Sequence, residues 1–222
     1  MRIDPTQIPA IMSKFAHLVE APYGDFRGIA DMAQEIMTPE TTALLARTVM
    51  QDPMGAKALR DRPRLGEIDL QALAAMPEGT LGCRYGHHMI DNGYSAPPIL
   101  PVSDAESYFI AHLVEVHDIW HVVTGWNTDK AGEIGLQGFY NSQLHPSQGF
   151  LALVAKNLLK TALEDLEQAD DHMRALVAGW LLGKKVKPLF GVDWKPLFPE
   201  KLADVRARFG FSDEPPISLA SR

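Results

Sequence analysis

The chain has 222 residues, of which 46% are hydrophobic and 22% are charged. This length and composition allow one sizeable hydrophobic core and exclude a wholly disordered chain. The net charge of −7 argues against a nucleic-acid-binding protein, because such proteins need a basic face to meet phosphates. A single cysteine, Cys83, excludes a disulfide framework and a cysteine-based zinc finger, so the eight histidines must supply the nitrogen ligands of any metal site.

The ends of the chain and its hydropathy predict the cellular location. Asp4 and Pro5 interrupt the N-terminal stretch, which therefore lacks the apolar core of a signal peptide. No run of about 18 uncharged apolar residues is present, so we expect no transmembrane helix. We expect a cytoplasmic protein without a signal or transit peptide, and a peripheral position on the inner face of the membrane is compatible with this expectation.

Helical capping and breaking signals recur along the chain. In order, the expected helices begin at Thr38-Pro39 and at Asp52-Pro53 and then cover about 69–76, 80–91, 103–124, 127–144, 148–167, 170–183 and 199–208. The longest is expected to start with a capping box formed by Ser103 and Glu106 and to stop at Gly125. The break before residue 148 is assigned to His145-Pro146.

These elements predict an all-α fold, because no two-residue alternation typical of strands is present. We expect one domain over residues 1–222, built as a multi-helix bundle. A proline-rich, aromatic arm over residues 187–199 is expected to pack Phe190, Trp194 and Phe198 against it. Residues 1–25 are interpreted as an N-terminal extension, and residues 212–222 as a flexible tail.

The most informative stretch is His117-Asp118-Ile119-Trp120-His121, with Glu133 twelve positions after His121. A helix advances about 100° per residue, so His117, Asp118 and His121 fall within an arc of about 100° on one helix face. The turn after Gly125 lets the chain reverse, and the next helix then brings Glu133 back. Two imidazoles and two carboxylates are therefore expected to converge on one metal ion.

The ligand types select the metal. Two neutral imidazoles with two carboxylates suit Zn²⁺, with Fe²⁺ or Mn²⁺ as alternatives, whereas Ca²⁺ and Mg²⁺ prefer oxygen ligands alone. A site without thiolates is more typical of catalytic than of structural zinc. A carboxylate that is not firmly bound could instead move protons, so Asp118 and Glu133 are also candidate catalytic residues.

Two other interpretations of the same residues stay open. The histidines and carboxylates could form a satisfied salt-bridge network between two helices, with no metal. They could also belong to a zincin-like peptidase, whose motif has glutamate directly after the first histidine as the general base. Here Asp118 holds that position, and its side chain is one methylene shorter than glutamate.

Residues 116–121, Gly125 and Gly132-Glu133 resemble the signature of the coenzyme Q (ubiquinone) biosynthesis protein 4 family, which is His-Asp-x-x-His, eleven residues, then Glu. Residues 61–64, Leu73, residues 77–82 and Tyr85 are similar to the upstream block of that family in order and spacing. The resemblance covers about residues 40–210.

This resemblance implies an all-α protein that binds zinc through His117, Asp118, His121 and Glu133. It also implies a role in ubiquinone biosynthesis on a polyprenylated hydroxybenzoate. The implied reaction removes the carboxylate at ring carbon 1, with oxidative replacement by hydroxyl, so the enzyme class would be a carbon–carbon lyase. The implied partners are other enzymes of the pathway, organised at a membrane surface.

Two functional hypotheses follow from the site and the resemblance. The first is the metal-dependent decarboxylase of a polyprenylated aromatic acid. The second is a non-catalytic, lipid-binding scaffold in which the metal only locks two helices together, and the lack of a flavin or nicotinamide fingerprint motivates it. A homo-oligomer is compatible with either hypothesis, and no nucleic-acid partner is expected.

A polyprenyl tail needs an apolar site, and two apolar stripes at helical spacing are candidates for it. Each of their residues, taken singly, is interpreted as core packing, and part of the stripes is a candidate lining for a tunnel to the metal. The stripes consist of Leu151, Val154, Leu158, Ala162 and Leu166, and of Val177, Trp180 and Leu181.

Several polar residues and glycines are interpreted from their neighbours. His87 and His88 could be additional metal ligands, but adjacent helical residues diverge by about 100°, so they are interpreted as surface or turn histidines. Arg62 and Arg64 could hold a carboxylate or a phosphate, but they are interpreted as solvated surface charges. Residues on the Glu133 side of its helix are candidates to support that ligand, and glycines near it indicate close approach of a facing helix or a ligand. These are Gln137 and Tyr140, and Gly132, Gly135 and Gly138.

Overall fold

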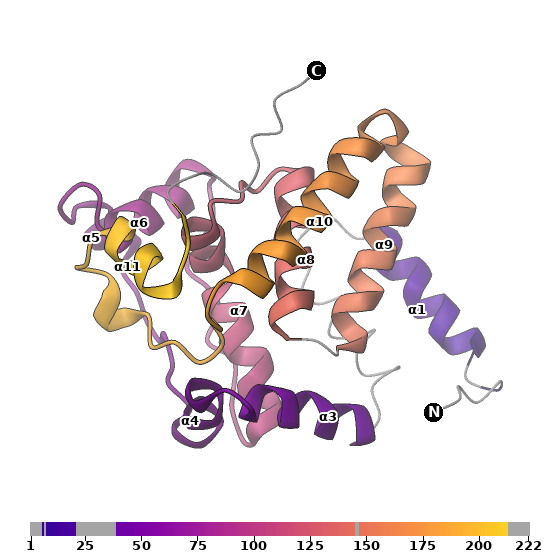
Figure 1. Cartoon of the computed structure of the whole chain (residues 1–222), viewed down its shortest axis with the longest axis horizontal. Helices are drawn as coiled ribbons and strands as arrows, with labels where there is room; N and C mark the ends of the chain where they lie inside the picture. Colours follow the sequence, from indigo (N-terminus) through magenta and orange to yellow (C-terminus); the bar gives the residue numbers. More distant parts are fainter. Residues whose placement is uncertain (1–5, 7, 21–38, 145–146, 213–222) are drawn as a thin grey trace. The chain divides into compact units, whose positions relative to one another are not determined.

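The computed structural model of the chain describes residues 6, 8–20, 39–144 and 147–212 (Figure 1). Within these ranges the regular structure is helical, and the β-bridge between Thr80 and Lys201 does not extend into a strand. The predicted all-α fold is therefore confirmed. The described helices gather into two compact units, formed by residues 1–48 with 128–181 and by residues 49–127 with 182–222.

The first unit is built around α9. It contains α1 (Ile8–Glu20), most of α3 (Pro39–Met50), α8 (Lys130–Gln143), α9 (Gln148–Glu164), the 3₁₀ turn η2 (Leu166–Gln168) and most of α10 (Ala169–Lys185). Both α8 and α1 pack against α9. Helix α1, which the sequence did not predict, buries Leu18, and the Lys160 ammonium of α9 donates a hydrogen bond to the Val19 carbonyl over 3.1 Å.

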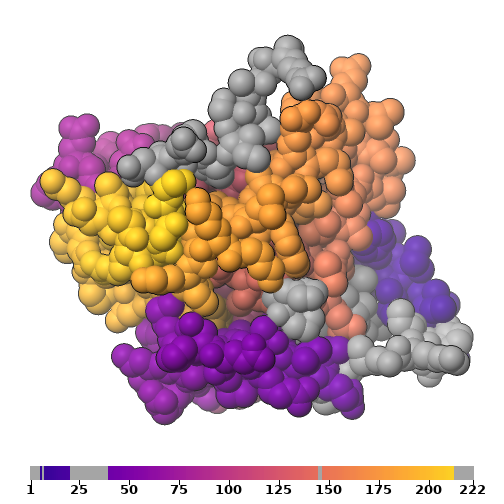
Figure 2. Space-filling view, viewed as in Figure 1, coloured from indigo at the N-terminus to yellow at the C-terminus, as the bar shows by residue number. Residues whose placement is uncertain are grey.

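The second unit is built around α6 and α7. It contains α4 (Pro53–Asp61), α5 (Leu70–Ala74), α6 (Leu81–Asp91), α7 (Ala105–Thr124), the 3₁₀ turn η3 (Lys195–Leu197) and α11 (Leu202–Phe209). Helix α6 packs against α5 and α7, and α4 and α11 also contact α7. Figure 2 shows the last part of the arm and α11 as one continuous surface, in light orange and yellow.

The aromatic arm packs as predicted. Phe190, Trp194 and Phe198 are all buried. Phe198 stacks on Tyr85 of α6 with 5.8 Å between ring centroids, and Trp194 lies against Phe209 of α11. The arm therefore contributes core side chains to the second unit although it has little regular structure.

Several helix ends are where local capping chemistry predicts them. Asp52, Asp69 and Thr80 accept hydrogen bonds from backbone N–H groups in the first turns of α4, α5 and α6, and Gly125 ends α7 with a positive φ of 85°. These ends depend on contacts within a few residues, which explains why the sequence predicts them. The signals assigned to Thr38 and to His145-Pro146 lie outside the described residues.

Other predicted ends were wrong by a few residues. In α7 the N-cap is Asp104, and Ser107 completes the capping box in place of Ser103 and Glu106. The Asp104 carboxylate accepts from the Ser107 N–H over 2.8 Å, and the Ser107 hydroxyl accepts from the Asp104 N–H over 3.0 Å, so two short side chains satisfy both donors. Helix α8 begins after Asp129, α9 ends at Glu164, α10 continues through Gly183 to Lys185, and α11 begins at Leu202.

Helix α9 exposes part of its predicted apolar stripe to solvent and buries several polar side chains instead. Its buried positions include four polar residues, Lys156, Asn157, Lys160 and Thr161. None of the five stripe residues predicted on this helix and η2 is fully buried, and Leu151 and Leu166 are exposed. Simple core packing is therefore the wrong interpretation for this stripe. No helix in the described part of the chain combines the length and apolar character needed to cross a membrane.

Glycines bring α8 and α10 into backbone contact within the first unit. A Cβ atom at Gly179 of α10 would lie 1.8 Å from the Gly135 carbonyl oxygen of α8, and one at Gly138 would lie 2.2 Å from the Leu176 carbonyl oxygen. The close approach inferred for Gly135 and Gly138 therefore involves a facing helix. Only hydrogen in place of a side chain permits this separation.

Replacing Gly179 by alanine is expected to lower the free energy of unfolding by about 1–3 kcal/mol, because the new methyl group forces α8 and α10 apart. Alanine otherwise favours a helix over glycine, so a loss of stability would isolate the steric effect. Urea unfolding measures the change. Leu181→Ala, at an exposed site on the same helix, should change stability by no more than about 0.5 kcal/mol. Equal or greater stability of Gly179→Ala would contradict the close contact.

Candidate metal centre

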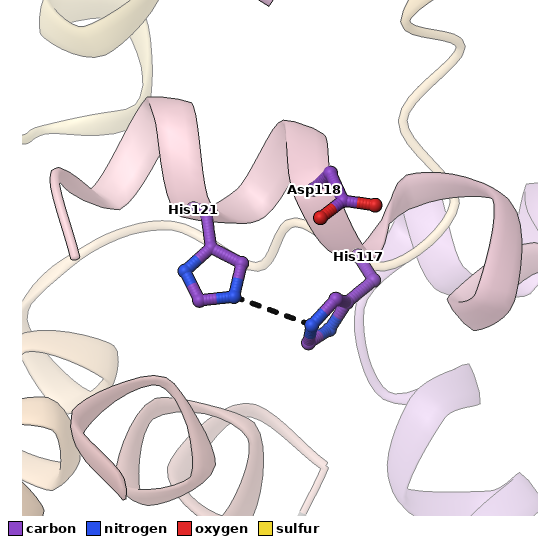
Figure 3. Close-up of side chains that lie close together, drawn as sticks. All are labelled: His117, Asp118 and His121. Atoms are coloured by element: carbon purple, nitrogen blue, oxygen red, sulfur yellow. Dashed lines mark hydrogen bonds between the residues drawn. The ribbon is translucent and has the colours of Figure 1, made fainter. Parts of the chain in front are cut away.

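Three of the four predicted ligands lie together on α7. The helix begins at the Asp104 cap and runs unbroken to Gly125, so residues 117, 118 and 121 keep regular helical spacing. One ligand atom from each of His117, Asp118 and His121 lies within 4.8 Å of the others. Figure 3 shows the two imidazoles side by side below the helix, with the Asp118 carboxylate near His117.

The two imidazoles present their Nε2 atoms to each other. These atoms are 3.2 Å apart, and the rings meet edge to face, with planes at 89° (Figure 3). The other ring nitrogen of His121, Nδ1, lies 3.0 Å from the Trp126 carbonyl oxygen. A carbonyl only accepts, so Nδ1 of His121 carries the proton, and the lone pair of the neutral ring is on Nε2.

This arrangement fits a zinc ion. In tetrahedral coordination at about 2.0–2.1 Å, two nitrogen ligands are about 3.3 Å apart, close to the 3.2 Å found between the two Nε2 atoms. The Trp126 carbonyl fixes the tautomer of His121 in the way that outer hydrogen bonds fix metal-bound histidines. With the Asp118 carboxylate alongside, His117, Asp118 and His121 supply donors of the types that Zn²⁺, Fe²⁺ and Mn²⁺ accept.

The site is partly enclosed and electrostatically suited to an ionised carboxylate. His121 is only 1% exposed, whereas His117 and Asp118 are half-buried. Burial raises the pKa of the Asp118 carboxyl, but the adjacent His88 imidazole and the charges of His117 and His121 outweigh burial, so the net shift of this pKa is downward. A carboxylate that stays ionised is available as a ligand.

Glu133, the fourth predicted ligand, lies in the first turn of α8 in the other compact unit, where it is 8% exposed. The three residues that the structure brings together do not include it, and its part in the site stays a prediction. Gln137, one turn further along α8, is also buried, and its side-chain oxygen accepts a hydrogen bond from Asn157 of α9. Gln137 thus links two helices of the first unit.

His88 of α6 also belongs to the surroundings of the site, contrary to the surface position predicted for it. Its Nε2 lies 3.7 Å from the Asp118 Oδ1 atom, and its ring stacks on His121 with 5.9 Å between centroids. Only its neighbour His87 is a surface residue, with 56% of its side chain exposed. The spacing of Leu81, Tyr85 and Met89 on the buried face of α6 was a sequence signal that could have separated the two histidines.

Tyr85 is a second α6 residue, and its ionisation depends on the charge of Asp118. The ring is fully buried, and in the described structure its hydroxyl has no hydrogen-bond partner. Burial raises the pKa of the Tyr85 hydroxyl well above its ordinary value, and the negative charge of Asp118 raises it further. The hydroxyl therefore stays neutral and keeps its proton as a hydrogen-bond donor.

Comparison with known proteins identifies the family. The sequence profile described as "Coenzyme Q (ubiquinone) biosynthesis protein Coq4" matches residues 6–215. The chain belongs to this family. The resemblance noted in the sequence is thereby confirmed, and it extends further towards the N-terminus than the motifs indicated.

Individual relatives agree with this assignment. The chain is 28% identical over 214 residues to the mitochondrial ubiquinone biosynthesis protein COQ4 of Pyricularia oryzae, covering 93% of this chain and 68% of that protein. It is 29% identical over 196 residues to the mitochondrial coq4 protein of Aspergillus niger, covering 84% and 65% respectively. The chain thus spans about two thirds of the length of these relatives. Because both are named mitochondrial, their names do not support the predicted cytoplasmic location.

A solved structure matches the fold. A crystal structure of a protein assigned to ubiquinone biosynthesis, from Nostoc punctiforme PCC 73102, superposes with a TM-score of 0.79 at 25% identity. The match covers 92% of this chain and 96% of that chain. The chain therefore shares its helical fold with this solved structure.

Proposed function

We propose that this protein acts in ubiquinone biosynthesis as a metal-dependent decarboxylase that removes the carboxylate at ring carbon 1 of a polyprenylated hydroxybenzoate. One observation carries the proposal. His117 and His121 point their Nε2 atoms at a common position beside the Asp118 carboxylate, with the tautomer of His121 set by the Trp126 carbonyl. In this proposal His117, Asp118, His121 and Glu133 hold the cation, with Zn²⁺ favoured over Fe²⁺ and Mn²⁺.

The cation would supply positive charge that binds the substrate carboxylate or adjacent phenolic oxygen and stabilises the charge developing on the ring as carbon dioxide leaves. The protein residues do the remaining work. Asp118, with its depressed pKa, stays ionised and balances the positive charge of the site. A proton must reach the ring carbon that loses its carboxylate, and we assign its relay from a water molecule to the more weakly bound carboxylate, Asp118 or Glu133, which would hold that proton only in passing.

The oxidative form of this reaction replaces the lost carboxylate by hydroxyl and so requires an oxidant. The side chains around the site supply none, and we therefore assign the electron acceptor to dioxygen or to a partner enzyme of the pathway.

Exposed apolar side chains on the first unit support a role with a lipid-like substrate. Large apolar residues on α9, η2 and α10 are exposed, and they follow helical spacing on both long helices. They are Leu151, Leu159, Leu163, Leu166, Met173, Val177 and Leu181. A polyprenyl tail or a membrane surface would cover such side chains favourably, at about 25 cal/mol per Å² of apolar area.

The His121→Ala variant tests the proposed function. Loss of one ligand of a zinc site is expected to weaken metal binding by about 100-fold or more and to remove turnover of a prenylated hydroxybenzoate. Metal content by elemental analysis and product formation by mass spectrometry are the two measurements. His17→Ala, at an exposed histidine of α1, is the matched control. Full activity of His121→Ala at undiminished metal content would refute the role of the site.

A non-catalytic scaffold is the second candidate function, and the exposed apolar residues of α9 and α10 favour it. In that case the metal would only stabilise the fold, and the apolar surface would bind lipid or pathway enzymes. Metal removal should then lower the melting temperature and partner binding together, with no product under any condition. Product formed by the wild-type protein and lost in His121→Ala decides for the enzyme.

A further inference from the structure

We propose that His88 is a positioning residue of the metal site, whose Nε2–H group holds the Asp118 carboxylate beside His117 and His121. The inference rests on the proposed function, in which these three residues of α7 bind a divalent cation. His88 contributes from α6, so the site would depend on the packing of two helices of the same compact unit.

The packing of α6 determines which of its two adjacent histidines reaches the site. Thr80 caps the helix, and Gly86 lies so close to α5 that a Cβ atom there would be 2.4 Å from the Ala74 nitrogen. This contact fixes the rotation of α6 about its axis. As a result His88 meets α7, whereas His87 stays exposed, 3.9 Å from the Asp91 carboxylate.

Three neighbours fix the ring of His88. Its plane lies 24° from that of His121, with centroids 5.9 Å apart, and Tyr94 approaches with centroids 6.2 Å apart and planes at 60°. Its Nε2 atom is 3.7 Å from Asp118 Oδ1. The stacking holds the ring in place while its nitrogen is directed at the carboxylate, and only 15% of the side chain is exposed.

The Nε2 atom of His88 is buried and, in the described structure, has no hydrogen-bond partner. A buried polar group without a partner is unfavourable by about 1–3 kcal/mol. Asp118 offers a suitable acceptor, and closing 3.7 Å to a hydrogen bond of about 2.9 Å requires a movement of about 0.8 Å. Rotation of the carboxylate when a cation binds would supply this movement.

The two oxygens of Asp118 would then have different tasks. His117, Asp118 and His121 form the group whose ligand atoms lie within 4.8 Å of one another, and His88 is outside it. We therefore assign His88 to hold a ligand and not to bind the cation itself. One carboxylate oxygen would face the cation, and the other would accept from His88, an arrangement that typically strengthens metal binding 10- to 100-fold.

Substitutions at residue 88 test this role through metal affinity. His88→Phe keeps a ring that can stack on His121 but removes the donor, and zinc affinity measured by chelator competition should fall about 10- to 100-fold. His88→Gln restores an N–H donor at similar reach and should bind zinc within about threefold of wild type. His87→Phe, the adjacent exposed position, should leave affinity unchanged.

Two outcomes of the binding measurement would overturn the assignment. Unchanged affinity in His88→Phe would show that the donor is irrelevant, and equal weakening in His88→Gln would show that the donor is not what matters. X-ray absorption of the zinc-loaded proteins gives a further readout, because the number of bound imidazoles should be the same in wild type and His88→Phe. A lower number in the variant would make His88 a ligand.

A measurement without metal separates this inference from the proposed function. In the metal-free protein, ¹⁵N shifts of His88, recorded well above the ordinary histidine pKa, should show the proton on Nε2, as donation to Asp118 requires. A proton on Nδ1 would refute the inference even if the site binds zinc. Failure of the wild-type protein to bind any divalent metal would refute the proposed function and leave the ¹⁵N measurement as the test of the His88 contact.

Discussion

Replacing Glu115 by alanine is expected to lower the free energy of unfolding by about 3 kcal/mol, because it removes a buried carboxylate that holds three parts of the second unit together. Glu115 is 1% exposed and lies on α7, two residues before His117. Its Oε1 accepts hydrogen bonds from the Arg64 guanidinium, and its Oε2 accepts from the Leu65 backbone N–H over 2.9 Å. Arg64 also donates to the Leu100 carbonyl over 2.9 Å.

The size of this loss of stability depends on the Arg64 guanidinium, which the alanine variant leaves without its carboxylate partner. Breaking a buried ion pair by removing one partner is destabilising by about 3–5 kcal/mol, and the lower end applies because 26% of the Arg64 side chain is exposed and can rehydrate. Urea unfolding followed by circular dichroism measures the loss. Glu106→Ala, at an exposed position in the first turn of the same helix, should lose no more than about 1 kcal/mol. Equal losses in the two variants would contradict the buried pair.

The stability of the protein is expected to fall by about 3 kcal/mol as the pH is lowered from about 6.5 to about 4, because of His112. This residue of α7 is buried among Tyr108 and Phe190, and the Gly191 N–H donates to its Nε2 over 3.0 Å. Burial lowers the pKa of His112 to about 4 from an ordinary value of 6.5, and the positive charge of Arg64 contributes.

The sign of the effect follows from the two pKa values. Above pH 6.5 the ring is neutral in both the folded and the unfolded chain, and its contribution to stability is complete. Between pH 6.5 and pH 4 the unfolded chain takes up the proton and the folded chain does not. The free energy of unfolding therefore falls by about 1.4 kcal/mol for each unit by which the pH is lowered.

Unfolding free energies of metal-free protein across this pH range check the prediction. His112→Gln keeps an acceptor for the Gly191 N–H but does not titrate, so the pH dependence of its stability should be weaker than that of wild type by about 3 kcal/mol over the interval. His87→Gln, at an exposed site, should retain the wild-type dependence. An identical dependence in His112→Gln would show that His112 does not cause the loss.

The parts of the structure that depend on neighbouring residues could be predicted from the sequence. Thr80 and Asp52 cap their helices through side-chain oxygens that reach N–H groups two or three residues away. His117, Asp118 and His121 converge because helical spacing places them on one face. The burial of Trp194 in the arm likewise follows from its large apolar surface.

The parts of the structure that depend on packing between distant segments could not be predicted from the sequence. Which of His87 and His88 meets α7 is decided by the contact of Gly86 with α5, and the apolar spacing on α6 indicates its buried face but not that this face meets the metal ligands of α7. Arg64 was predicted to be a solvated charge, yet it pairs with Glu115, which is 51 positions away in sequence. The Trp126 carbonyl that orients His121 is a backbone atom, and its position depends on the turn after Gly125 and not on the identity of its side chain.

The buried polar side chains of α9 also could not be predicted from the sequence. Hydrophobic periodicity assigns Leu151 and Leu166 to the interior, but both are exposed, and Asn157 and Thr161 are among the buried residues of α9. They are accommodated because polar groups on other helices of the first unit contact them. The Asn157 amide donates to Gln137, and the Thr161 hydroxyl lies 2.8 Å from His172 Nδ1.

The three donors supplied by α7 are only a single helical turn apart, between residues 117 and 121. Most metal centres gather ligands from distant segments, and ordering the intervening chain opposes their assembly. In the proposed metal centre that entropic penalty is nearly absent, because formation of α7 alone brings the three donors together. The bound ion would then favour the helical form of the segment on which the rest of its unit condenses.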